Sequence, residues 1–232
     1  MKPKYKYINL NKKIYKVKIK KNLRAKKIIL RISNVNPYIY LTIPKNENEK
    51  NAIDFLFRNK EWVLNELKRI PKKILFLNNS EIPYMGVTHR IVYAGEYTNL
   101  IYIYDKKIMV FGKKEEISKN LKNWLYHKAK IEILKIAKLK VSFLNKKYNK
   151  IKIKDLKSSW GTCGENGNLS FSWRLILAPK HVMEYIVVHE LCHLVELNHS
   201  KKFWILVTEL FPQKKLSQDW LKTNGTYLHT FD

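Results

Sequence analysis

The chain has 232 residues, of which 45% are hydrophobic, so it can form one large or two small domains, and its composition argues against disorder. Lys and Arg number 46 against 19 Asp and Glu, which gives a net charge of +27. This excess predicts either a surface simply rich in lysine or an attraction to nucleic acid, nucleotides or acidic proteins.

The two cysteines, Cys163 and Cys192, argue against a disulfide framework and are typical of a reducing, cytoplasmic compartment. Residues 1–21 carry charges throughout and lack the apolar core of a signal peptide. No segment approaches eighteen apolar residues, so we expect no membrane span.

The first half of the chain is predicted to be rich in strands. Alternating apolar and polar residues predict strands at 5–9, 14–20, 26–33, 38–43, 74–77, 88–93, 100–104 and 108–111. Helical spacing of apolar residues predicts one helical segment at 46–68. We therefore expect residues 1–112 to form a strand-rich N-terminal domain with one helix.

The second half is predicted to be mainly helical. A long helical stretch is expected at 115–148, strands at 150–156 and 169–176, a short helix at 203–211, and a last helical turn or two at 216–223 that ends near Gly225. Residues 113–232 are thus expected to form a second domain, and the chain as a whole an α+β protein.

His189-Glu190-Leu191-Cys192-His193 forms an H-E-x-x-H pattern inside an apolar helical segment. On a helix, residues four apart share a face, so His189 and His193 can bind one divalent metal while Glu190 lies beside the open coordination position. Buried imidazoles and carboxylates are costly unless a metal or hydrogen bonds compensate. The pattern predicts a zinc site with a water-activating carboxylate. The alternative is a pair of core histidines bonded to backbone carbonyls.

His199 is the expected third ligand, because three protein ligands leave the open position of a catalytic zinc site. It lies six residues past His193, so the chain must turn at Leu197-Asn198, with Asn198 able to close the helix in a left-handed conformation. The spacing equals that of the metzincins, although Glu196 replaces their glycine. The other reading of His199 is a solvated loop histidine, and the other candidate ligands are Glu196, Glu209 and His229.

Several short motifs occur together in a fixed order. They are Ser159-Trp160-Gly161-Thr162-Cys163, Ser172-Trp173-Arg174-Leu175, Ala178-Pro179, Tyr185 to His193, Asn198-His199-Ser200 and Phe203-Trp204. This combination resembles the YgjP-like family of metal-dependent hydrolases, most strongly over residues 115–225 and more loosely over the N-terminal half. The family is related to the SprT-like zinc proteases.

The resemblance implies a zincin-like metallopeptidase domain with His189, His193 and His199 as ligands of one Zn²⁺, or another divalent metal, and Glu190 as the base. Many relatives carry arginine where this chain has Ser159, so a role of that arginine in holding substrate would be filled differently here. In zincins an edge strand before the metal helix pairs with an extended substrate. Trp160 and Cys163 would then line the cleft, or Trp160 would pack in the core with Trp173 and Trp204.

The leading hypothesis is a zinc-dependent hydrolase, namely a metallopeptidase that cleaves peptide bonds of a peptide or protein by metal-activated water, with Glu190 as general base. Tyr185 and Arg174 are candidates for stabilising the oxyanion. One alternative is a metal-dependent hydrolase of nucleotide phosphoanhydrides, although no Gly-rich phosphate loop supports it. Another is a basic nucleic-acid-binding module with a structural metal.

Overall fold

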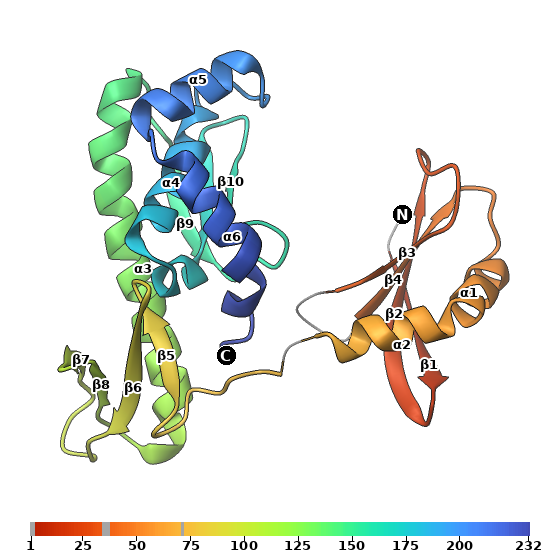
Figure 1. The fold of residues 1–232 in the computed structure, drawn as a ribbon, viewed down its shortest axis with the longest axis horizontal. Coiled ribbons are helices and arrows are strands. Elements are labelled where there is room, and N and C mark those ends of the chain that lie inside the picture. Colours follow the sequence, from red (N-terminus) through yellow and green to blue (C-terminus); the bar gives the residue numbers. More distant parts are fainter. Residues whose placement is uncertain (1–2, 34–37, 71) are drawn as a thin grey trace. The chain divides into compact units, whose positions relative to one another are not determined.

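The computed structural model describes residues 3–33, 38–70 and 72–232. Contacts between Cα atoms divide the chain into two compact units, Met1–Lys72 and Lys73–Asp232 (Figure 1). Each unit has its own hydrophobic core. Within the described ranges, every helix is too short or too polar to cross a lipid bilayer.

The N-terminal unit is built on a four-stranded sheet with the order β1-β2-β4-β3. β1 (Lys4–Leu10) and β2 (Lys13–Asn22) form a hairpin, because Asn11 and Lys12 take φ values of 51° and 63°, as a two-residue turn requires. β4 (Tyr38–Pro44) pairs in parallel with β2 and antiparallel with β3 (Ile29–Ile32). The expected strands are confirmed here.

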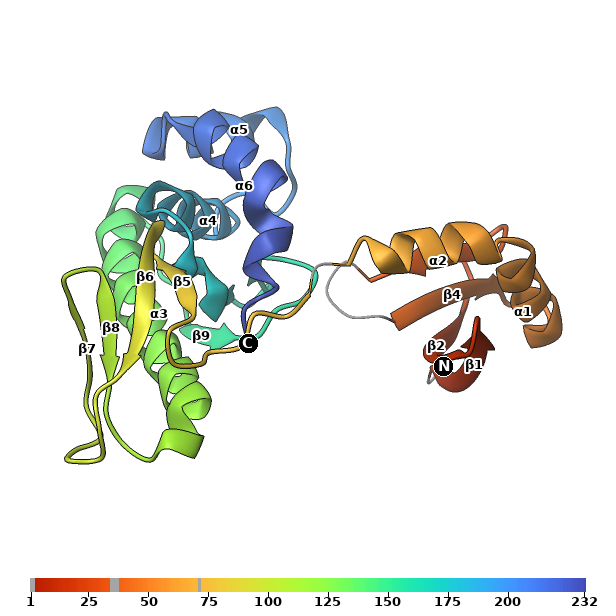
Figure 2. The ribbon, with the colours of Figure 1, turned by 60° about the horizontal axis from the view of Figure 1, so that its bottom comes forward.

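Two helices cover one face of this sheet (Figure 2). They are α1 (Glu49–Arg58), whose N-cap Asn48 accepts a hydrogen bond from the Lys50 N–H, and α2 (Lys60–Lys68). The single helical segment predicted at 46–68 is thus interrupted at Asn59. The buried side chains alternate along the strands and recur with helical spacing: Val17, Ile19, Ile39, Leu41, Ile43, Ala52, Leu56 and Val63.

A second four-stranded sheet, in the order β5-β6-β8-β7, belongs to the C-terminal unit. Its strands are β5 (Glu81–Tyr84), β6 (Val87–Tyr93), β7 (Ile101–Tyr104) and β8 (Lys107–Val110). β5 was not predicted, and the strand expected at 74–77 is reduced to an isolated bridge between Ile74 and Phe231.

The boundary between the two compact units follows residue 72, which differs from the boundary expected at residue 112. The packing of this second sheet explains the difference. Ile82, Ile91 and Ile108 of the sheet belong to the same core as the helices that follow. The N–H of Met85 donates to the carbonyl of Ile176 at 2.7 Å. Alternation along a strand identifies a buried face, but it does not identify the core that the face joins.

The rest of the C-terminal unit has a long helix, a small sheet and three further helices. α3 (Ile117–Val141) is flanked by short 3₁₀ helices at Lys114–Glu116 and Ser142–Leu144. β9 (Lys150–Lys154), β10 (Gly161–Cys163) and β11 (Asn168–Ser172) form a sheet in the order β10-β11-β9. The chain then passes through a 3₁₀ helix, η3 (Trp173–Leu177), to α4 (Lys180–Cys192), α5 (Lys201–Leu210) and α6 (Lys214–Leu228).

Three expectations for this unit need correction. The strand predicted at 169–176 ends at Ser172, because the Ser172 side chain accepts a hydrogen bond from the Arg174 N–H and caps η3. β10 was not predicted as a strand. The last helix does not end near Gly225 but continues to Leu228. Gly225 is buried within this helix and faces the indole of Trp160.

Candidate metal centre

The H-E-x-x-H pattern lies at the C-terminal end of α4, a helix buried within the C-terminal unit. α4 contacts α3, α5, α6 and β10. Nine of its thirteen residues are buried, as expected for a helix that is apolar nearly all round. His189 and Glu190 lie in its last turn and His193 is its C-cap residue.

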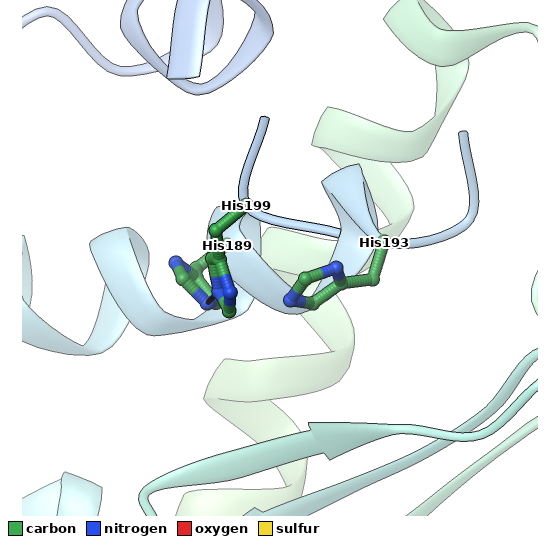
Figure 3. A group of neighbouring side chains, drawn as sticks. All are labelled: His189, His193 and His199. Carbon is green, nitrogen blue, oxygen red and sulfur yellow. Dashed lines mark hydrogen bonds between the residues drawn. The ribbon is translucent and has the colours of Figure 1, made fainter. Parts of the chain in front are cut away.

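The imidazole rings of His189, His193 and His199 converge (Figure 3). Each residue offers one ring nitrogen, and these nitrogens lie within 4.8 Å of one another. The Nε2 atoms of His189 and His199 are 3.0 Å apart. In the part of the chain that the structure describes, this is the one group of three or more His, Cys, Asp or Glu side chains arranged to hold a metal.

The protonation states of these rings suit a divalent cation. The Nδ1 of His193 lies 2.9 Å from the carbonyl oxygen of Glu196, so Nδ1 carries the proton and Nε2 keeps a free lone pair. Burial, followed by the neighbouring His193 and His199, lowers the pKa of His189 to about 4. Burial also lowers the pKa of His193. The rings of His189 and His193 are therefore neutral near pH 7, the form in which imidazole binds zinc.

His199 reaches the cluster from the segment between α4 and α5. The turn expected at Asn198 is present, but Asn198 does not take the predicted left-handed conformation, because α4 has already ended at its C-cap His193. Ser200 then caps α5 by accepting a hydrogen bond from the Phe203 N–H at 3.2 Å. This cap fixes the chain direction directly after His199.

Two aromatic residues of α5 pack against the histidine rings. Phe203 stacks on His193, with ring centroids 4.5 Å apart, and contacts the edges of the other two rings. Trp204 stacks on His199 at 5.6 Å. Phe203 is fully buried and Trp204 is half-buried, so both pack against the rings and restrict their orientation.

Glu190 is buried beside the histidines with 6% of its surface exposed. Burial raises the pKa of its carboxyl group to about 7. A Cβ atom built on Gly161 of β10 would lie 2.5 Å from Cγ and 2.8 Å from Oε1 of Glu190. Any residue with a Cβ atom at position 161 would force the Glu190 side chain to move from this position. The sequence motif alone did not reveal this requirement for glycine.

A pocket of about 730 Å³ opens over the three histidines and Glu190. It is bounded by β10 and the segment before it, by α4, by the chain around His199, and by α6. Its lining comprises Ser159, Trp160, Gly161, Thr162, Cys163, Tyr185, Ile186, His189, Glu190, His193, Leu197, His199, Gln218, Leu221 and Lys222. Three of the four residues predicted to bind substrate, Trp160, Cys163 and Tyr185, are therefore at the pocket.

Arg174, the fourth predicted substrate-binding residue, is not at the pocket. It is fully buried, its guanidinium pairs with Asp155, and its Nη2 donates to the carbonyl oxygen of Phe231 at 3.2 Å. η3 places this side chain in the interior, so Arg174 does not reach a bound substrate. Its position in a 3₁₀ helix could not be read from a segment that alternates like a strand.

The other candidate ligands also lie apart from the ring nitrogens. The Glu196 carboxylate accepts a hydrogen bond from Ser200 at 3.3 Å, and Glu209 is exposed on α5. His229 stacks on Trp160 with ring centroids 4.8 Å apart.

The contribution of α6 to the pocket wall was not predicted from the sequence. Gln218, Leu221 and Lys222 line the pocket from one face of α6, and the side-chain amide of Gln218 donates to the Tyr185 hydroxyl at 3.0 Å. Their spacing of three and four residues is a signal for a shared helical face, but it does not show what that face adjoins.

Comparison with known proteins assigns the chain to a family. The profile described as "YgjP-like, metallopeptidase domain" matches residues 26–224. No curated protein matches at a significant level. Among solved structures, the metallopeptidase zymogen of Pyrococcus abyssi abylysin is 28% identical, with a TM-score of 0.35, over 39% of this chain and 90% of that chain. The family match spans most of the sequence, so this protein belongs to the YgjP-like family of metal-dependent peptidases.

Proposed function

We propose that this protein is a zinc-dependent peptidase in which His189, His193 and His199 hold the metal and Glu190 is the general base. The observation that carries the proposal is the convergence of three imidazoles beside a buried carboxylate in one open pocket. Three imidazole donors suit zinc among the common divalent metals and leave a coordination position free. When bound, the metal would supply a Lewis acid that polarises the scissile carbonyl and makes water more acidic.

Glu190 moves the proton in this proposal. A carboxyl group with a pKa of about 7 can both accept and return a proton at neutral pH. Its carboxylate takes a proton from the attacking water as the new C–O bond forms. It then gives that proton to the leaving nitrogen as the peptide C–N bond breaks, so the carboxylate is regenerated and one water is consumed per bond cleaved.

β10 provides the surface on which a peptide can lie. The N–H of Ser172 donates to the Trp160 carbonyl, and the N–H of Gly164 donates to the Asn168 carbonyl, each at 2.9 Å. Because hydrogen-bonded positions alternate along an antiparallel pair, the backbone groups of Gly161 and Cys163 point away from β11. β10 is the edge of its sheet, so an extended substrate can pair there as an added strand.

We also assign roles to two other residues of the pocket, Tyr185 and Cys163. The Tyr185 hydroxyl accepts from Gln218, which leaves its own proton free to donate to a developing oxyanion. Burial raises the pKa of the Cys163 thiol, so Cys163 contributes backbone and shape to the pocket rather than a nucleophile.

The pocket does not favour hydrolysis of a nucleotide. Among the described residues, its lining includes one lysine, Lys222, and no arginine. A triphosphate needs several cationic or backbone N–H contacts to neutralise its charge.

The substitution Glu190→Gln tests the proposal. We expect it to abolish peptide hydrolysis while the protein still binds one zinc per chain. The matched control Glu209→Gln, on the exposed side of α5, should keep full activity. Cleavage of a mixed peptide library, metal content and phosphate release from nucleoside triphosphates are measured in parallel. Retained hydrolysis in Glu190→Gln, or phosphate release without peptide cleavage in the unsubstituted protein, would refute the proposal.

A further inference from the structure

The N-terminal sheet has a second face, opposite the one that α1 and α2 cover. Because side chains alternate along a strand, this face carries Tyr5 and Tyr7 of β1, Lys16 and Lys18 of β2, and Tyr38 and Tyr40 of β4. We call these six residues the tyrosine–lysine face. Their neighbours in sequence, such as Val17, Ile39 and Leu41, are buried on the helical side.

The strand register makes this face an alternating pattern of rings and ammonium groups. Tyr5 pairs with Lys18 and Tyr7 with Lys16 across β1 and β2, and the same two lysines pair with Tyr40 and Tyr38 across β2 and β4. The Lys16 ammonium lies 4.5 Å from the ring centroid of Tyr5 and 5.8 Å from that of Tyr38. Lys18 lies 5.9 Å and 5.8 Å from the rings of Tyr5 and Tyr40.

The charge of this face is entirely positive. Lys20 of β2 and Arg31 of β3 fall on the same side by alternation and register, and the strands contribute no Asp or Glu to it. Among the described residues, Lys16 and Lys18 form no ion pair with a carboxylate. By contrast, Lys4 and Lys6, on the opposite side of β1, both pair with Glu49.

Three of the four tyrosines on this face are exposed to solvent. Tyr5 is 52% exposed, Tyr7 70% and Tyr38 39%. Large apolar rings left in water beside unpaired cations are typical of a surface that binds a ligand with both aromatic and anionic parts. A polymer with a planar base and a phosphate in each unit has that composition.

We propose that the tyrosine–lysine face binds single-stranded nucleic acid, with unpaired bases stacked on the tyrosine rings and phosphates beside Lys16 and Lys18. A duplex keeps its bases paired and offers them no stacking, and an acidic peptide would use the lysines but not the rings. This face belongs to the N-terminal unit and the histidine pocket to the C-terminal unit, and binding at the face does not depend on the proposed peptidase mechanism.

Fluorescence anisotropy of the full chain with labelled single strands of about 20 nucleotides tests this inference. We expect Tyr5→Ala combined with Tyr7→Ala to weaken binding at least about thirtyfold, because each of the two stacked bases contributes roughly 1 kcal/mol or more. Tyr5→Phe combined with Tyr7→Phe should retain the affinity, since the rings remain. We expect Lys16→Gln with Lys18→Gln to reduce the slope of log affinity against log salt by about 1.4.

Two control variants remove the same groups from other surfaces. Lys50→Gln with Lys68→Gln changes exposed lysines of α1 and α2, and Tyr97→Ala with Tyr104→Ala removes rings that are 91% and 69% exposed. Both should bind as the unsubstituted chain does. Equal losses in the control and face variants, binding of poly-glutamate or duplex as tight as that of the single strand, or unchanged affinity after loss of Tyr5 and Tyr7, would overturn the inference.

Discussion

The contact between Gly161 and Glu190 gives the most specific prediction, namely that adding one methyl group opposite the carboxylate inactivates the enzyme without unfolding it. In Gly161→Ala the new Cβ would lie 2.5 Å from Glu190 Cγ and 2.9 Å from Cδ. Ordinary carbon contacts are about 3.5 Å or longer, so the side chain must move by about 1 Å. The displaced atoms run from Cγ to the carboxylate and lie beside the open pocket, so the cost to folding is expected at the lower end of the range for overpacking, about 1 kcal/mol.

The effect on catalysis should be much larger than the effect on stability. A shift of about 1 Å in a reacting group can reduce the rate about 100-fold, which corresponds to about 2.7 kcal/mol of lost transition-state stabilisation. The assay compares kcat for a cleaved peptide, zinc content and thermal unfolding. In the control Gly164→Ala, the new Cβ would find its nearest atom, Oδ1 of Asn166, at 3.3 Å, and kcat should be unchanged. A Gly161→Ala enzyme with normal kcat, or equal losses in the two variants, would refute the role given to Gly161.

Three further predictions concern the ligands, the buried ion pair and the response to acid. His199→Ala should weaken zinc binding at least about tenfold in a competition titration with a chelator, because one of three ligands is lost; unchanged affinity would exclude His199 from the site. Asp155→Ala should lower the free energy of unfolding by about 3 kcal/mol in a urea titration, since Arg174 would stay buried without its carboxylate; a loss below about 1 kcal/mol would contradict this. Burial, then Arg174, Lys157 and Lys73, lower the pKa of His229 from 6.5 to about 4. The unfolded chain therefore binds the extra proton between these values, and stability is full above pH 6.5 and falls by up to about 3 kcal/mol as the pH drops toward 4. His229→Phe, which keeps a ring against Trp160, should flatten that part of the profile, and an unchanged slope would show that another group titrates.

The sequence was most informative where the chemistry is local. The four-residue spacing of His189 and His193 follows directly from helix geometry, and the same segment contains the adjacent Glu190. His199 was also expected near them. The left-handed conformation predicted for Asn198 was wrong, because α4 ends at His193, before that turn. The first hairpin and the strands of the N-terminal sheet were predictable because alternation and turn residues act over a few positions.

Features that depend on contacts between distant segments were not predictable. Arg174 was expected near the substrate, but its ion pair with Asp155 and its bond to Phe231 hold it in the interior. The need for glycine at position 161 arises from a side chain of another element, Glu190 of α4. The place of the second sheet in the C-terminal core depends on which apolar faces meet, which periodicity within a strand does not encode.

X-ray absorption spectroscopy of the zinc-loaded full chain tests the central claim most directly. The account predicts three imidazole nitrogens at about 2.0–2.1 Å from the metal and no sulfur ligand, with one nitrogen lost in each of His189→Ala, His193→Ala and His199→Ala. A sulfur ligand at about 2.3 Å, which would implicate Cys163, or a coordination shell unchanged by these substitutions, would contradict it.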